Sequence, residues 1–472
     1  MKLILSGKIN RTYVQTLCMM FWHGEKFPEN ETDSSKKLIV STEDTAEGIK
    51  CECELTICGQ TVKEASFVPF SKNEKYERTS KSAVGIAVYN AGVKLTGRKI
   101  PWGILTGIRP SKLANELLEI NSKEDTKAIL QKRYLLSEKK ADLAVRVANN
   151  ENEILKISDN STCSLYISIP FCPSRCNYCS FISYATPRLF ELIPDYINKL
   201  TKEIKLTLEN IKKQGLRILS IYIGGGTPTV LTESQLEEVL QTIYYSINVE
   251  DLIEFTLESG RPDTITDRKL EIAKKYGVNR ISVNPQTLND DILKLIGRHH
   301  TVKDFFEAYS KVQSSGIKFI NTDLIAGLEN DSFDSFKNTI DNIIKLSPHN
   351  VTVHSFSVKK SAQILKDNAD IYSSKDDCAI KSVDYAYEAL TNNGYEPYYM
   401  YRQKNTVCDL ENVGYAKKGT FGIYNVLMMS DCHTVFGVGA GATTKLVKNI
   451  DGILEIKRIF SPKYPYEYLQ DN

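Results

Sequence analysis

The chain of 472 residues has little net charge and no long apolar run. Its 60 lysines and arginines against 58 aspartates and glutamates leave a formal charge of +2, so no global field favours nucleic acid or a membrane surface. The apolar stretch after Met1 is too short for a signal sequence, and no run is long enough to span a bilayer. The composition therefore predicts a cytoplasmic globular protein, and the length suggests about two to four domains.

Disulfide bonds are not expected. The 11 cysteines are dispersed through a long chain without a secretion signal, whereas disulfide frameworks occur in small secreted domains. Cys51 and Cys53 alternate with charged residues in the run 49–58, as in a half-buried strand. A metal role for these two and Cys58 is the alternative, but a free cysteine also packs as a small hydrophobic residue.

Three cysteines, Cys172, Cys176 and Cys179, follow a short apolar strand at the spacing CxxxCxxC. Three thiolates in one tight loop cannot complete a tetrahedral zinc site, whereas a [4Fe–4S] cluster can be held through three of its irons. S-adenosylmethionine can chelate the open fourth iron, and an electron from the cluster then releases a 5′-deoxyadenosyl radical. This spacing, with Tyr178 before the third cysteine, is the signature of the radical S-adenosylmethionine superfamily. The alternatives are a zinc knuckle without a nearby fourth ligand and three reduced structural thiols.

Strands and helices alternate regularly from Cys163 onward, which indicates βαβ units and a parallel sheet. Six strands are expected, near residues 165–169, 218–223, 253–258, 280–284, 318–325 and 350–356. Six βα units are too few for a closed eight-stranded barrel and predict an α/β fold with an open three-quarter (β/α)6 barrel. The chain is expected to divide into a β-rich N-terminal domain (1–101), a helical connector (102–160), the partial barrel (161–360) and a mixed C-terminal domain that covers the substrate (361–472).

Glycines and polar residues stand at the ends of the predicted strands. The run Gly224–Thr229 contains three glycines, which allow a ligand to approach the backbone and offer amide donors. Glu258, Gln286 and Asp323 lie at or near the ends of later strands, and Arg298 lies on an intervening helix. Such sheets collect ligand-binding residues at their carboxyl edge, so these residues predict one binding rim. Each of them alone is equally compatible with a surface position.

The C-terminal part contains a tyrosine-rich run, 395–404, with Arg402 and Lys404 beside the rings. Together with Lys359, these cations are candidate contacts for the carboxylates of a flat or macrocyclic substrate. An ordinary aromatic core explains the tyrosines equally well.

Taken together, these motifs resemble those of the oxygen-independent coproporphyrinogen III oxidases, also called dehydrogenases. The match runs from about Cys163 to Phe356, and its motifs are Tyr166-x-x-Ile-Pro-Phe-Cys172-x-x-x-Cys176-x-Tyr178-Cys179, Gly224-Gly-Gly-Thr-Pro-Thr229, Gln286, Gly297-Arg298 and Asp323-Leu-Ile-x-Gly-Leu328. The N-terminal domain and the stretches 101–110 and 401–416 resemble the longer HemZ-type branch more narrowly.

This resemblance implies roles for individual residues. Cys172, Cys176 and Cys179 would bind the cluster, and Tyr166 and Arg298 would be catalytic. The residues implied to contact S-adenosylmethionine are Tyr166, Tyr178, Gly225, Gly226, Thr227, Glu258, Gln286, Arg298 and Asp323. The implied reaction removes a hydrogen from a propionate β-carbon, releases CO₂ and one electron, and leaves a vinyl group. A tetrapyrrole substrate and an electron donor such as flavodoxin or ferredoxin are the implied partners.

The sequence departs from the related oxidases at several positions. Phe181 stands where they carry a fourth cysteine, a feature shared with the cluster-containing haem chaperones, and Ser168 stands where both groups carry a histidine. The chaperones also have a C-terminal His-Asn-x-x-Tyr-Trp motif. The comparable segment here, Tyr-Asn-Val-Leu-Met-Met at 424–429, lacks the histidine and the tryptophan, and Cys432 or His433 is the candidate substitute haem ligand. A haem chaperone and a radical enzyme acting on another tetrapyrrole are therefore the alternatives.

Overall fold

The computed structural model describes residues 1–29, 35–71, 74–179, 183–357, 376–403, 409–450 and 453–470. The chain forms two compact units, one made of Met1–Ala148 with Tyr401–Glu411 and the other of Asn149–Met400 with Asn412–Asn472. None of the helices within the described residues is long and apolar enough to cross a membrane.

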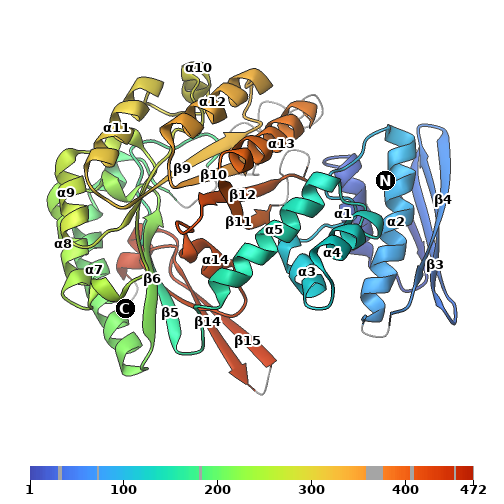
Figure 1. The fold of residues 1–472 in the computed structure, drawn as a ribbon, viewed down its shortest axis with the longest axis horizontal. Coiled ribbons are helices and arrows are strands. Elements are labelled where there is room, and N and C mark those ends of the chain that lie inside the picture. The colour runs from blue at the N-terminus through green and yellow to red at the C-terminus, as the bar shows by residue number, and fades with distance from the viewer. Residues whose placement is uncertain are drawn as a thin grey trace. The chain divides into compact units, whose positions relative to one another are not determined.

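The first unit contains a four-stranded sheet in the order β1-β2-β3-β4, in which β1 is parallel to β2 and the other pairs are antiparallel. In β3, Cys51, Cys53 and Leu55 are buried while Glu52 is exposed, which confirms the predicted alternation. One face of the sheet packs on α2 (Figure 1). The elements are β1 (Lys2–Ser6), α1 (Arg11–Phe21), β2 (Lys36–Asp44), β3 (Gly48–Ile57), β4 (Gln60–Pro69), α2 (Tyr76–Thr96), α3 (Pro110–Leu118), α4 (Lys123–Lys132) and α5 (Glu138–Leu155).

The second unit is built on an 11-stranded sheet whose order is β11-β12-β10-β9-β8-β7-β6-β5-β13-β14-β15. Its centre consists of the six predicted parallel strands, β5 (Thr162–Ile169), β6 (Arg217–Gly225), β7 (Glu254–Ser259), β8 (Arg280–Val283), β9 (Phe319–Ala326) and β10 (Asn350–Ser355). Nearly all residues of β7 and β8 are buried, although polar residues alternate with apolar ones in both strands. The predicted open α/β barrel is confirmed.

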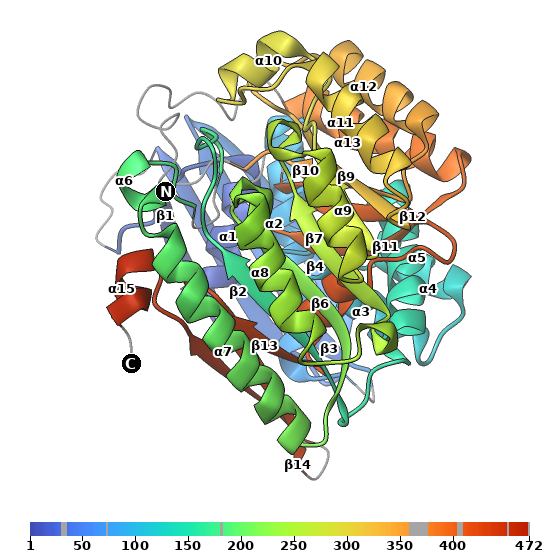
Figure 2. The same cartoon turned by 90° about the vertical axis from the view of Figure 1, so that its left-hand side faces the viewer.

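Helices separate the parallel strands along the chain, and α7, α8 and α9 lie side by side on the outer face of the sheet (Figure 2). Two of the helices, α8 and α11, begin with reciprocal capping boxes at Thr232 and Thr301. The helices are α6 (Pro187–Phe190), α7 (Ile193–Lys213), α8 (Glu233–Tyr244), α9 (Asp267–Lys275), α10 (Asp290–Leu295), α11 (Val302–Ser314), α12 (Phe333–Leu346), α13 (Asp376–Asn392), α14 (Ile423–Met429) and α15 (Pro465–Gln470).

The C-terminal segment extends the sheet at both ends. β12 (Glu411–Lys417) pairs antiparallel with β10 and carries β11 (Tyr395–Arg402) at its outer side, while β13 (Thr434–Val438) pairs parallel with β5. β13 is followed by the hairpin of β14 (Thr443–Ile450) and β15 (Ile453–Phe460). Ser168 on β5 is buried and donates a 2.7 Å hydrogen bond to the Ala440 carbonyl in the β13–β14 turn. Since β6 pairs with its other edge, β5 has a paired strand on each side.

Candidate functional site

The three predicted cluster cysteines lie in the loop that follows β5. At its root, the Cys172 amide donates to the Tyr184 carbonyl at 3.0 Å and the Tyr184 amide donates to the Pro170 carbonyl at 2.8 Å. Near its tip, the Asn177 amide donates to Ile296 at 3.1 Å, at the end of α10. Main-chain hydrogen bonds thus hold the loop at its root and near its tip. The residues between its cysteines form neither helix nor strand.

Cys172 is the most enclosed of the three cysteines. Its Sγ lies 3.4 Å from the Thr227 hydroxyl, and burial raises the pKa of its thiol to about 11. Cys176 and Cys179 are partly exposed. A thiol in this setting stays protonated until a metal provides the positive charge that favours the thiolate.

The glycine loop after β6 packs directly beneath the cysteine loop. The Gly226 amide donates to Ile169 at 2.8 Å and the Thr227 amide donates to Phe171 at 2.7 Å. Gly225 has a φ of +113°, and a Cβ on Gly226 would lie 2.5 Å from the Phe171 carbonyl oxygen. Glycine is therefore required at both positions, and the two loops form one edge of the barrel.

Glu258 and Asp323 face the same interior space from β7 and β9. Burial, followed by the negative charge of Asp323, raises the pKa of Glu258 to about 8. Asn284 donates to the Asp323 carboxylate at 2.9 Å, and His354 Nε2 lies 3.9 Å from that carboxylate. Asp323 therefore has polar support from both neighbouring strands, whereas Glu258 holds a proton near neutral pH.

Gln286 has an unusual backbone and an unsatisfied side chain. Its φ is +68°, in the left-handed region that non-glycine residues rarely adopt, and its amide donates to the Asp323 carbonyl at 3.1 Å. Its side-chain oxygen is buried and has no hydrogen-bond partner among the residues described in the structure. Strain and an unpaired buried acceptor at one residue point to a bound donor group.

Arg298 follows α10 and is buried against the same edge. Its two terminal nitrogens donate to the Gly260 carbonyl at 2.7 Å, the Asn284 carbonyl at 3.0 Å and the Tyr178 hydroxyl at 3.3 Å. Arg298 thereby connects the cysteine loop with the ends of β7 and β8. Its Nε has no partner within the described ranges.

Tyr166 lies deeper in the barrel than the strand-end residues. It stacks on Tyr222 at a ring-centroid distance of 6.3 Å and on Tyr424 at 6.2 Å, and Tyr222 and Tyr424 are 4.6 Å apart. These three rings form one stacked cluster contributed by β5, β6 and α14. Burial raises the pKa of all three phenols, so each stays neutral.

Two residues beside the cysteine loop have no counterpart in the sequence-based prediction. Arg261 lies just after Glu258 and contacts Cys176, and His300 lies just after Arg298 and is buried with neither ring nitrogen paired to any described residue. The run Gly260-Arg261-Pro262-Asp263 directly after a strand-end carboxylate was the available signal. The significance of Arg261 depends on its contact with Cys176, which lies 85 positions earlier in the chain.

The chemistry of these residues fits a [4Fe–4S] cluster with S-adenosylmethionine. The loop offers three thiols, the Gly225–Thr227 backbone lies next to it, and the Gln286 oxygen is a buried acceptor without a partner. No three His, Cys, Asp or Glu side chains of the described part of the chain converge as ligands of one metal ion. Thiolates that bind three different irons lie farther apart than ligands of one ion, so this finding is compatible with a cluster.

The C-terminal residues suggested as substitute haem ligands differ in accessibility. Cys432 is exposed, whereas His433 is buried and both its ring nitrogens are paired, Nδ1 with Ser158 at 2.6 Å and Nε2 with Ser164 at 2.9 Å. Ser164 also contacts Ser220 at 2.7 Å. Burial lowers the pKa of His433 to about 4. His433 is a structural residue in this arrangement and presents no free nitrogen to a haem.

The structure describes one of the three candidate carboxylate contacts. Arg402 is buried in the first unit, where its Nε donates to Asp409 at 3.0 Å, another nitrogen donates to Leu105, and the guanidinium lies over the Trp102 ring. Lys359 and Lys404 lie outside the described residues. Tyr395, Tyr398 and Tyr399 are buried, as expected for an aromatic core.

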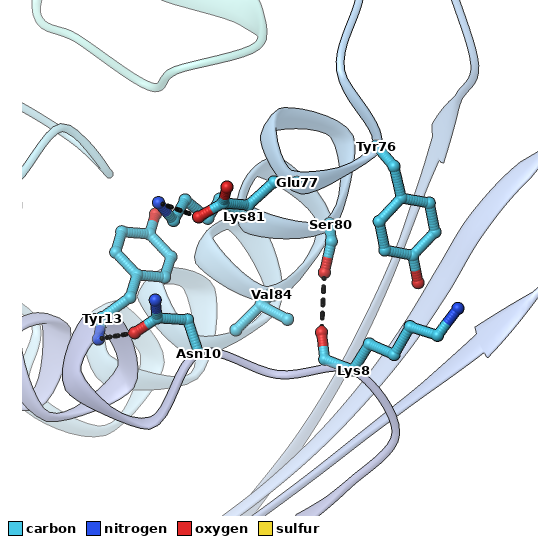
Figure 3. Close-up of a pocket in the computed structure, with 8 residues that line it drawn as sticks. All are labelled: Lys8, Asn10, Tyr13, Tyr76, Glu77, Ser80, Lys81 and Val84. Atoms are coloured by element: carbon cyan, nitrogen blue, oxygen red, sulfur yellow. Dashed lines mark hydrogen bonds and ion pairs between the residues drawn. The ribbon is translucent and has the colours of Figure 1, made fainter.

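A small pocket of about 160 Å³ lies in the first unit between α1 and α2 (Figure 3). Its polar groups pair with one another, since Ser80 donates to the Lys8 carbonyl at 3.2 Å and Lys81 lies 2.8 Å from Glu77. These pairings leave little polar capacity for a ligand, so no binding role is assigned to it.

Comparison with known proteins identifies relatives across most of the chain. Residues 166–343 match the family model of the radical SAM superfamily. The oxygen-independent coproporphyrinogen-III oxidase-like protein HemZ of Bacillus subtilis is 34% identical over 408 residues, which cover 85% of this chain and 81% of that protein. The heme chaperone HemW of Bacillus subtilis is 36% identical, over 42% of this chain and 51% of that protein.

Among solved structures, the radical SAM enzyme coproporphyrinogen III oxidase HemN of Escherichia coli matches with a TM-score of 0.53 and 20% identity, covering 68% of this chain and 71% of that one. At this identity the match concerns the fold.

Proposed function

We propose, because this chain belongs to the radical SAM superfamily and within it to the family of the coproporphyrinogen-III oxidase-like protein HemZ, that it converts coproporphyrinogen III to protoporphyrinogen IX without O₂. Proteins of this superfamily use a [4Fe–4S] cluster and S-adenosylmethionine, as predicted from the cysteine spacing. When bound, these cofactors would supply a 5′-deoxyadenosyl radical for removal of a hydrogen atom from a propionate β-carbon; loss of CO₂ would then leave a vinyl group, and an external one-electron acceptor would take up the released electron. The observation that carries the proposal is the gathering of the cysteine loop, the glycine loop and the unpaired Gln286 oxygen at one edge of the barrel.

In this proposal each group at the edge has a separate task. Cys172, Cys176 and Cys179 would hold the cluster. The Gly225–Thr227 backbone and the Gln286 oxygen would bind the nucleoside and amino-acid parts of S-adenosylmethionine through hydrogen bonds. Arg298 would hold the cysteine loop to the ends of β7 and β8 while it orients Tyr178.

The interior charges suit a cationic cofactor beside a reaction that must exclude water. Because Glu258 holds a proton near neutral pH, it adds no second negative charge beside the Asp323 carboxylate, which would face the sulfonium group. The stacked rings of Tyr166, Tyr222 and Tyr424 lie near Glu258 and add neutral, largely apolar surface there. A dry interior protects a carbon radical from side reactions.

A haem chaperone is the second candidate function. It is favoured by the identity to HemW proteins, which extends over about half of their length in the Bacillus subtilis case. The engagement of both His433 nitrogens argues against it, because the remaining candidate ligand in that segment is Cys432.

The deciding experiment is anaerobic turnover of cluster-reconstituted protein with a reductant, S-adenosylmethionine and coproporphyrinogen III, followed by mass spectrometry. We expect the loss of two CO₂ per porphyrinogen together with 5′-deoxyadenosine. Cleavage of the cofactor with intact porphyrinogen would mean that the substrate is a different tetrapyrrole. Stoichiometric haem uptake without either product would support the chaperone.

Matched cysteine variants sharpen this test. We expect Cys176→Ala to lose cluster iron and S-adenosylmethionine cleavage while its circular dichroism spectrum stays unchanged, and we expect exposed Cys432→Ala to keep both. Full cluster iron in Cys176→Ala would contradict the ligand assignment. Loss of haem uptake in Cys432→Ala alone would support the chaperone instead.

A further inference from the structure

Arg261 reaches the cysteine loop from the end of β7. Its Nη1 donates to the Ser174 hydroxyl at 2.9 Å and to the Ser174 carbonyl at 3.4 Å, and the same nitrogen lies 3.8 Å from Cys176 Sγ. Its Nε pairs with Asp263 at 3.2 Å. The guanidinium is therefore fixed in direct contact with one of the three cluster thiols.

The same side chain has an unused donor in a buried place. Arg261 is 2% exposed, and its Nη2 is buried with no hydrogen-bond partner in the part of the chain that the structure describes. A buried cation whose donor group remains unpaired is costly unless an anion or acceptor is present in the functional state. A cluster with its thiolates and sulfides is an acceptor of this kind, and it would be adjacent to Cys176.

Asp263 is the only carboxylate that the structure pairs with Arg261 among the described residues, and its side chain is 30% exposed. Solvent screens an exposed charge more than a buried one, so Asp263 offsets the buried guanidinium incompletely. The neighbouring His300 adds no charge near pH 7, because burial lowers its pKa to about 4. Arg298 also interacts electrostatically with Cys176, so two arginines outweigh the one carboxylate and the net charge near Cys176 is positive.

We propose that Arg261 is a positioning residue that raises the reduction potential of the cluster bound by Cys172, Cys176 and Cys179. Reduction adds one electron from an external one-electron donor, and no bond forms or breaks. The added negative charge is stabilised by a fixed cation and by hydrogen bonds to the thiolate, both of which favour the reduced form. The inference rests on the cluster part of the proposed function and does not depend on the porphyrin substrate.

The test is an EPR-monitored redox titration of the reconstituted protein, with Arg261→Gln and Arg261→Lys compared with the unaltered protein. We expect Arg261→Gln to make one-electron reduction at least about tenfold less favourable, which corresponds to a potential about 59 mV more negative. Arg261→Lys keeps the charge without the planar donor set, so its potential should lie between those of the unaltered protein and Arg261→Gln. Arg268→Gln, which removes an exposed arginine on α9, is the matched control and should leave the potential unchanged.

A second variant moves the potential in the opposite direction. Asp263→Asn removes the partner charge but leaves Arg261 in place, so we expect a more positive potential. If Arg261→Gln fails to retain its iron, Asp263→Asn and Arg261→Lys decide the question. Potentials equal to that of Arg268→Gln in these variants would overturn the proposal, whereas shifts of opposite sign would support it, whichever tetrapyrrole the protein uses.

Discussion

The carboxyl group of Glu258 should make the protein less stable as pH rises, and Glu258→Gln should remove that dependence. The pKa of Glu258 is raised from its ordinary 4.5 to about 8, first by burial and then by Asp323. Between those values the folded state keeps a proton that the unfolded state releases. The unfolding free energy therefore decreases with rising pH through this window and becomes level above about pH 8.

The expected size follows from this window. Each pH unit within it corresponds to about 1.36 kcal/mol. Linkage for one group gives Glu258→Gln an advantage over the unaltered protein that grows by about 3 kcal/mol between about pH 5.5 and 8.5. Since 1 kcal/mol moves the melting temperature of a domain of 150–250 residues by roughly 2–4 °C, we expect about 6 °C for the larger second unit.

The assay is the thermal unfolding of cofactor-free protein across this pH range, followed by circular dichroism. Glu209→Gln, at an exposed position on α7, serves as the control and should follow the unaltered protein. Only the difference between variants matters, because other groups titrate in the same range. If Glu258→Gln and the unaltered protein lose stability in parallel, Glu258 is not protonated in the folded state and the charge assignment at the barrel edge is wrong.

Three further outcomes are expected. Gly226→Ala should lose most of its cluster iron, because its Cβ would lie 2.5 Å from the Phe171 carbonyl oxygen; reconstitution to full iron would contradict this. Asp323→Ala should weaken S-adenosylmethionine binding by about tenfold or more, as expected for the loss of a hydrogen bond to a charged group, while iron content stays the same; an equal loss of both would indicate a structural role. Lys140→Met and Glu411→Gln should each cost about 3–5 kcal/mol in chemical denaturation, because each removes one partner of a buried 2.7 Å ion pair, and the double variant should cost less than the sum of the two; strict additivity would show that the pair is not coupled.

The parallel strands could be predicted from the sequence because each has a local apolar signal and a regular spacing. The same holds for β3, where alternation of Cys51 and Cys53 with charged residues indicates one buried face. β13 gave no comparable signal: it is short and ends in a glycine-rich turn, and it becomes a strand by pairing with β5. The predicted division into four domains stays a prediction, and the return of Tyr401–Glu411 to the first unit has no sequence pattern that announces it.

The candidate site shows the same difference between local and distant information. The cysteine spacing, the glycine run and the strand-end carboxylates are contiguous motifs, so the sequence predicts them. Arg261 and His300 become significant only through residues that the fold brings next to them. The role of His433 also depends on two serines from other elements, which no local pattern reveals.

The position of β13 has a consequence for how the protein is made. β5, which leads into the cysteine loop, pairs through Cys163 with Thr434, about 270 residues later in the chain. At roughly 5–20 residues per second, a ribosome needs about 15–50 s to synthesise that interval. During this time the strand that supports the cysteine loop has one unsatisfied edge, so the loop reaches its final support only when the last part of the chain has emerged.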